Sequence, residues 1–252
     1  MAGERHEVDA EGFVSVDDLR TALRPDTTVV SIMYANNEVG TVEPIAELAA
    51  AVKSYDHHIV FHTDAVQAAG ALELNVDTLG VDLLSLAGHK IYGPKGVGVL
   101  YIRPRTPFVG QLLGGSQERN RRAGTENLAG AVGMAKALQL AEAERAANTA
   151  HLTELRDYLA TELPTRMRGV RLTGASDPSK RLPNSFSCCL EGVEGEAVLI
   201  QLDLNGISCS SGSACTTGSL EPSHVLTAMG VPPDIARASP VSYTHLTLPT
   251  KA

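Results

Sequence analysis

The chain of 252 residues carries 21 basic and 29 acidic side chains, which gives a formal net charge of −8. Such an acidic balance argues against a surface that binds nucleic acid. Hydrophobic residues make up 43% of the chain, yet no stretch approaches the ~18 apolar residues of a membrane-spanning helix. The N-terminus lacks the apolar region of a signal peptide. We therefore expect a soluble, cytoplasmic protein with no membrane and no nucleic acid partner.

The first half of the sequence alternates short apolar strands with amphipathic helices. This order is typical of an α/β fold with a mainly parallel sheet. Strands are expected at residues 28–33, 59–61, 81–87 and 96–102, and helices from a capping box at Ser15 to about Leu23 and from Pro44 through Val52.

In the second half, the apolar spacing predicts a long helix from Leu128 to near Ala147 and a second helix from His151 to about Leu163. We place a domain boundary there, between a large domain at 1–147 and a small domain at 148–239. The small domain is expected to hold a strand at 184–188, a helix at 195–202 and a Ser/Gly-rich loop at 208–219. Residues 240–252 have no regular pattern and resemble translated adapter DNA, so we expect a non-native tail.

The cysteines, Cys188, Cys189, Cys209 and Cys215, all lie in the last third, and none forms a C-x-x-C pair. Zinc and redox sites usually carry such pairs, so the sequence predicts no resident metal. Cys215 lies in the loop at 208–219, whose small polar residues cannot form a core, and we expect that loop to carry it between partners. Cys188 and Cys189 are expected to pack on a strand, and Cys209 is a weaker candidate.

Two polar residues, Asp64 and Gln67, follow the strand at residues 59–61, where open α/β sheets bind ligands. A carboxylate there can pair with a ring N–H group. The alternative is that Asp64 caps the next helix, and the residues alone leave both interpretations open.

Lys90 follows the strand at residues 81–87. A lysine at the end of an apolar strand is poorly solvated, which lowers its pKa and favours the nucleophilic amine that forms a Schiff base. Gly88 would let the backbone approach a ligand closely. An ordinary surface lysine is the alternative.

Thr125 follows Arg121 and Arg122 at the start of the long helix. A hydroxyl, backbone N–H groups and basic side chains at a helix start form a site for phosphate. An ordinary Thr N-cap is the alternative.

These clusters occur in one order along the chain, together with an Asn-rich motif before them. The motifs are Asn36-Asn-Glu-Val-Gly-Thr41, His62-Thr-Asp64-x-x-Gln67, Gly88-His-Lys90-x-Tyr-Gly-Pro-Lys-Gly96, Ala123-Gly-Thr125 and Ser210-Ser-Gly-Ser-Ala-Cys215-Thr. With them the chain resembles the pyridoxal-phosphate-dependent cysteine desulfurases of the class V aminotransferase group that serve iron-sulfur cluster assembly. The resemblance implies the α/β fold type I of pyridoxal-phosphate-dependent transferases plus a smaller α+β C-terminal domain, both incomplete here.

The resemblance also implies how pyridoxal 5'-phosphate is bound. Lys90 would hold it as a Schiff base, and Asp64 would pair with the pyridine nitrogen and keep the ring an electron sink. Gln67 and Asn37 would hydrogen-bond near the phenolic oxygen or the substrate carboxylate. His89, beside the phosphate, joins Lys90 among the expected catalytic residues.

For the remaining motifs, the resemblance implies a shared site and a persulfide. Thr125 would reach the phosphate bound in a partner subunit, which implies a homodimer. Cys215 would be the nucleophile that takes sulfur from L-cysteine, leaves L-alanine, and hands its persulfide to an acceptor or scaffold protein. At that stage Cys215 would transiently contact an iron-sulfur cluster.

Three departures from the family pattern lead us to expect an inactive fragment of an active enzyme. Ala87 stands where the family often has a phosphate-binding Ser, which Ser85 or water would have to replace. The family's preceding segment, with a phosphate loop and a ring-stacking His, is absent. After Ser239 the family continues with an Arg that clamps the substrate carboxylate, and Val241 occupies that place. A selenocysteine lyase or other class V lyase, and a non-catalytic scaffold that binds through its cysteines, remain alternatives.

Overall fold

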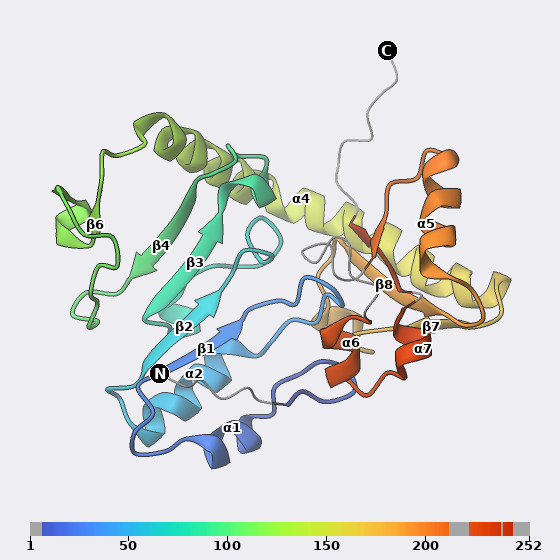
Figure 1. Ribbon diagram of the computed structural model, residues 1–252, viewed down its shortest axis with the longest axis horizontal. Helices are drawn as coiled ribbons and strands as arrows, with labels where there is room; N and C mark the ends of the chain where they lie inside the picture. Colours follow the sequence, from blue (N-terminus) through green and yellow to red (C-terminus); the bar gives the residue numbers. More distant parts are fainter. Residues whose placement is uncertain (1–6, 212–221, 238, 244–252) are drawn as a thin grey trace. The chain divides into compact units, whose positions relative to one another are not determined.

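A computed structural model describes residues 7–211, 222–237 and 239–243 of the chain (Figure 1). The chain forms two compact units. Unit 1 takes Met1–Leu19, Ala35–Glu43 and Ala146–Ala252, and unit 2 takes Arg20–Tyr34 and Pro44–Arg145. The expected large domain at 1–147 therefore differs from unit 2, because the two N-terminal segments make their contacts with C-terminal residues distant in sequence.

Unit 2 contains a four-stranded sheet in the order β1 (Val29–Met33), β2 (Val60–Asp64), β3 (Leu83–Ala87) and β4 (Gly98–Ile102). The first three strands are parallel, and β4 is antiparallel to β3, as the arrows in Figure 1 show. A parallel partner needs a crossover of a dozen or more residues, which the connection after β3 does not provide. The mainly parallel sheet is as the sequence predicts.

Helix α2 (Ile45–Tyr55) buries the apolar residues that its spacing predicts, among them Leu48 and Val52. Pro44 is its N-cap rather than its first helical residue. Helix α1 (Val16–Ala22) begins as expected, since the Asp18 N–H donates to Ser15 Oγ at 3.2 Å. Unit 2 also contains the short helix α3 (Val76–Leu79) and a two-stranded sheet of β5 (Ser116–Gln117) and β6 (Arg122–Ala123).

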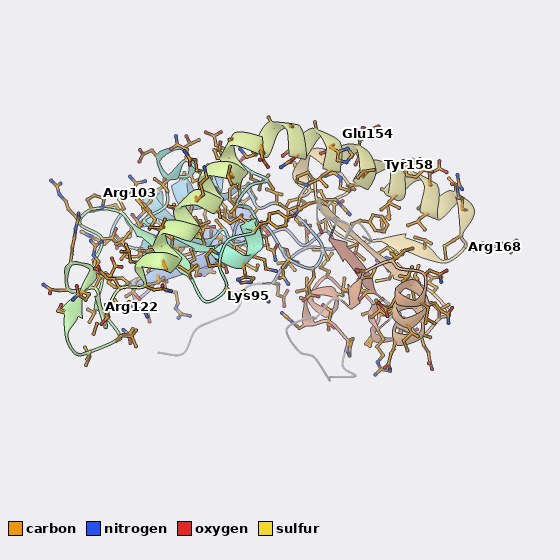
Figure 2. All side chains as sticks on the ribbon, turned by 90° about the horizontal axis from the view of Figure 1, so that it is seen from above. Lys95, Arg103, Arg122, Glu154, Tyr158 and Arg168 are labelled. Carbon is orange, nitrogen blue, oxygen red and sulfur yellow. The ribbon has the colours of Figure 1, made fainter. Side chains whose placement is uncertain are left out.

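Helix α4 is continuous over Leu128–Arg166, so the expected break between residues 147 and 151 is wrong. No glycine or proline occurs between Gly133 and Pro164, and uninterrupted helix formers continue the hydrogen-bond ladder. The chain passes from unit 2 to unit 1 within this helix, at Arg145. Glu154 and Tyr158 lie on its second part (Figure 2).

The loop after β3 packs closely on the first part of α4 through glycines. A Cβ atom on Gly88 would lie 3.1 Å from Met134 Sδ, and one on Gly93 would lie 3.1 Å from Ala137 Cβ. A Cβ on Gly133 would lie 2.5 Å from Pro94 Cγ. These glycines let two backbones approach each other, so the expectation that Gly88 makes room for a ligand is wrong: its neighbours are Pro94, Val97 and Met134 of the chain itself.

Gly133→Ala is expected to lower the free energy of unfolding by about 1–3 kcal/mol, because the added methyl group overlaps the Pro94 ring. Helix propensity alone predicts the opposite sign, since Ala is favoured over Gly by about 1 kcal/mol. Urea unfolding followed by circular dichroism measures the difference. Lys136→Ala, on the exposed side of α4, is the control and should stay within about 0.5 kcal/mol. A stabilised Gly133→Ala variant would contradict the packing.

In unit 1, an antiparallel sheet has the order β7 (Val170–Leu172), β8 (Ser185–Leu190), β10 (Pro240–Tyr243) and β9 (Ser210–Ser211). Helices α5 (Gly195–Leu204), α6 (His224–Ala228) and α7 (Pro233–Ala236) accompany it. The sequence analysis expected residues 240–252 to be a non-native tail outside the fold. This is wrong for residues 240–243, because they form β10, which pairs with both β8 and β9.

Thr41 joins three separate segments of unit 1. Its side chain is fully buried, its Oγ1 donates to the Glu11 carbonyl at 2.6 Å, and it accepts from the Ala175 N–H at 3.1 Å.

Nearby, Glu43 accepts from the Val14 N–H at 3.1 Å. The pKa of Glu43 is raised to about 7, mainly by burial; the hydrogen bond from Val14 opposes this rise and the charge of Asp9 adds to it.

Within the described residues, no helix has the length and apolarity to cross a membrane.

Candidate active site

The carboxyl ends of β2 and β3 meet at one edge of the unit 2 sheet (Figure 1). Asp64 ends β2 and lies opposite Ser85 of β3, and the Ala65 N–H donates to the Ser85 carbonyl at 3.0 Å. Strand β3 ends at Ala87, and the 3-10 turn η1 (Gly88–Ile91), which carries Lys90, follows directly. Parallel pairing therefore places the candidate carboxylate, at the end of β2, and the candidate amine, in the turn after β3, at the same sheet edge.

Asp64 is half-buried, whereas the preceding Thr63 points to the other face and is fully buried. The Asp64 Oδ1 atom accepts the Val66 N–H at 2.9 Å. Residues 66–71 form turns rather than a helix, so the alternative of Asp64 as a helix cap is wrong. Gln67 is half-buried in these turns, just past the strand end.

A histidine that the sequence analysis used only as part of a motif bridges three strands on the Asp64 face. His62 Nδ1 lies 2.8 Å from Ser31 Oγ of β1, and His62 Nε2 lies 2.8 Å from Ser85 Oγ of β3. Burial lowers the pKa of His62, and the charge of Asp64 opposes this in part. The sequence could have predicted this, because His62 precedes Asp64 by two positions and alternate strand residues share a face. The Ser85 hydroxyl is thus engaged by His62.

The lowered pKa of His62 predicts a pH dependence of stability. The unfolded chain takes up a proton near the ordinary pKa of about 6.5, and the folded chain does so only at lower pH. This group therefore stabilises the fold above that range, and the contribution is lost as the pH falls below about 6.5. The free energy of unfolding of wild type should fall more steeply between pH 7.5 and pH 5 than that of His62→Gln, as urea titrations at each pH will show.

Glu43 titrates in the same range with the opposite sign, because its pKa is raised, but it is present in both proteins and cancels in the comparison. His151→Gln, at an exposed position of α4, is the matched control and should follow wild type. Parallel curves for wild type and His62→Gln would contradict a buried neutral imidazole.

Lys90 and its neighbour His89 are exposed in η1. The expected poor solvation of Lys90 is therefore wrong for this chain. Its place is set by the backbone: the Gly88 N–H donates to the Val97 carbonyl at 2.9 Å, and the Gly93 N–H donates to the Gly88 carbonyl at 2.8 Å. The turn that presents Lys90 is thus held by hydrogen bonds on either side.

Thr125 is exposed and does not begin α4. Asn127 takes the capping role, since its Oδ1 accepts the Gly130 N–H at 3.0 Å. The alternative of Thr125 as an N-cap is therefore wrong. Arg122 lies in β6, several residues before the helix begins (Figure 2), so the arginines do not flank the helix start as expected.

One candidate, Asn37, lies in unit 1 rather than in unit 2. Asn37 is half-buried in the segment Ala35–Glu43, where Asn36 Oδ1 accepts the N–H groups of Glu38 at 2.8 Å and Val39 at 3.0 Å. This turn fixes the backbone around Asn37. Cys215 lies outside the described residues.

The cysteines of β8 are packing residues, as expected. Cys188 is 3% exposed and Cys189 is fully buried. Burial raises the pKa of Cys188 to about 12 and that of Cys189 to about 11. Thiolates are the reactive form of cysteine, so these two side chains are unsuited to nucleophilic attack at neutral pH. Cys209 is half-buried.

These pKa values predict that Cys188 and Cys189 resist alkylation. At pH 8 a thiol of pKa about 12 is ionised in about one molecule in ten thousand. Iodoacetamide should leave both residues unmodified in the native chain, while Cys209 reacts, and should modify all of them in urea. Peptide mass spectrometry reads the sites. Equal labelling of Cys188 with and without urea would contradict its burial.

Residues 4–246 match the family model of the class-V aminotransferases. The chain belongs to this family. It is 56% identical to the cysteine desulfurase IscS of Dictyoglomus turgidum over 92% of this chain and 58% of that protein, and 50% identical to the IscS of Methanosarcina thermophila over 92% and 56%. The solved structure of a NifS-like protein superposes with a TM-score of 0.85 at 35% identity, over 94% of this chain and 61% of that one. A structure described as SspA in complex with cysteine gives 0.75 at 30% identity, over 94% and 64%.

These likenesses confirm the expected family and fold class. The chain spans a little under three fifths of the length of the curated relatives that it matches.

Proposed function

We propose that the protein to which this chain belongs is a cysteine desulfurase. It takes the sulfur of L-cysteine, releases L-alanine and carries the sulfur as a persulfide on Cys215. The observation that carries the proposal is the shared sheet edge at which the Asp64 carboxylate and the turn bearing Lys90 follow adjacent parallel strands. The identity to IscS proteins over nine tenths of the chain, and the cysteine bound by SspA, support it.

The donor set at this edge fits pyridoxal phosphate. An aldehyde requires a primary amine, which Lys90 offers, and a pyridine nitrogen requires a carboxylate, which Asp64 offers. His89 and Gln67 complete the set. The set has fewer donors for the phosphate group, because Ala87 supplies no hydroxyl and the Ser85 hydroxyl already contacts His62.

When bound, pyridoxal phosphate supplies an electron sink that stabilises negative charge next to the substrate's amino group. Asp64 would hold the pyridine nitrogen by accepting its proton in a hydrogen bond. Lys90 would hold the aldehyde, and its amine would move protons at the substrate Cα atom. His89, next in the same turn, assists these transfers.

Cys215 performs the sulfur transfer. Its thiolate attacks the substrate sulfur, a sulfur–sulfur bond forms, and the carbon–sulfur bond breaks with its electron pair left on carbon, which a proton then joins to give alanine. Because their pKa values are raised, Cys188 and Cys189 do not compete with Cys215 for the substrate sulfur.

We further propose a cytoplasmic homodimer, with Thr125 at the partner's phosphate, and an acceptor protein for the persulfide.

The proposal is tested in a full-length homologue that carries the matching residues. The purified enzyme should show a cofactor absorbance band and release sulfide from cysteine in the presence of a thiol reductant. Replacing the lysine that matches Lys90 with Ala should abolish both. Replacing the cysteine that matches Cys215 with Ala should keep the absorbance band and abolish sulfide release.

Lys95→Ala, in the same turn region, is the matched control for Lys90 and should keep the band (Figure 2). Undiminished sulfide release without the Cys215 thiol would refute the persulfide. An absorbance band that persists without the Lys90 amine would refute the assignment of the cofactor.

A further inference from the structure

A cluster of metal-ligating side chains lies at the opposite end of β2 from the candidate active site. Asp56, His57 and His58 connect α2 to β2, and one ligand atom from each lies within 4.8 Å of the other two. The imidazole rings of His57 and His58 have centroids 3.9 Å apart and planes inclined by 40°. Neighbouring residues in an extended chain point to opposite faces, so this convergence is a property of the folded connection.

The backbone of this connection is held on both sides. The Asp56 N–H donates to the Val52 carbonyl at 3.0 Å, and the Ile59 N–H donates to the Asp56 carbonyl at 3.2 Å. The His58 N–H donates to Asp56 Oδ1 at 2.8 Å. Because α2 and β2 fix the two ends, the ligands are brought together before any ion binds, which lowers the entropy cost of coordination.

The local charges favour a cation. Asp56 is the C-cap of α2, a helix of 11 residues whose dipole is negative at that end. Lys53, in the last turn of α2, forms an ion pair with Asp82 and donates to the Ile59 carbonyl at 2.6 Å, so its charge is already balanced. The side chains of His57 and Asp56 are 79% and 44% exposed, which leaves room for water at the remaining coordination positions.

We propose that Asp56, His57 and His58 form a surface site for a divalent transition-metal ion, with Zn²⁺ as the best match. Two imidazoles and a carboxylate are ligands that Zn²⁺ accepts, and tetrahedral zinc completes its shell with water. The site lies about 20 Å from Asp64 by the rise of an extended strand, so it is separate from the cofactor region and independent of the proposed function. The expectation of no metal rested on cysteine spacing, which has no bearing on this cluster.

The test uses the 252-residue chain after treatment with N-ethylmaleimide, which blocks the cysteines that react in the folded chain, so that their thiols do not bind the ion. Isothermal titration with Zn²⁺ should show one saturable equivalent in wild type. His57→Ala/His58→Ala should lose that equivalent, and Asp56→Asn, which keeps the acceptor for the His58 N–H, should weaken it. His151→Ala, an exposed histidine on α4, is the matched control and should bind as wild type does.

A second measurement locates the ion directly. In NMR spectra, the ring C–H signals of His57 and His58 should shift on addition of Zn²⁺ while that of His151 stays in place. Circular dichroism confirms that each variant is folded. Absence of zinc binding in wild type, or the same bound equivalent in the double variant, would overturn the proposal.

Discussion

The parallel register of β1, β2 and β3 is the constraint on which the candidate site depends. Parallel strands end at one edge of a sheet, so side chains that follow different strands come together there without being close in sequence. The pairing of Asp64 with Ser85 fixes how far each strand extends before its loop begins. A shift of one residue would turn Asp64 to the buried face that Thr63 occupies.

The same register creates the bridge through His62. An imidazole between two hydroxyls needs both serines on its own face of the sheet. Ser31 of β1 lies directly opposite His62, and Ser85 of β3 lies opposite Asp64, two residues further along β2. The half-buried histidine in turn is a hydrogen-bond partner for both hydroxyls. Strand alignment and side-chain polarity therefore support each other at the edge that carries Asp64.

Unit 1 shows a different dependence, on contacts between segments far apart in sequence. A single buried hydroxyl, that of Thr41, connects residues near the N-terminus to a loop beyond α4. The segment around it also carries Asn37, a candidate for the site. Within this unit, β10 lies between β8 and β9 and is held by backbone hydrogen bonds, which do not require a particular pattern of side chains.

Short-range patterns determined much of this protein from sequence alone. Short apolar runs and helical spacing located strands β1 to β4 and helix α2 to within a few residues, because burial in a core imposes those patterns locally. The ordered motifs around Asp64, Lys90 and Cys215 indicated the family. Tertiary structure alone decided the rest: the membership of Ala35–Glu43 in unit 1, the strand β10, the exposure of Lys90, and the convergence of His57 with His58. The first two depend on which distant segments meet, and the last two depend on how the folded elements hold a turn or a connection. A local pattern in the sequence specifies neither.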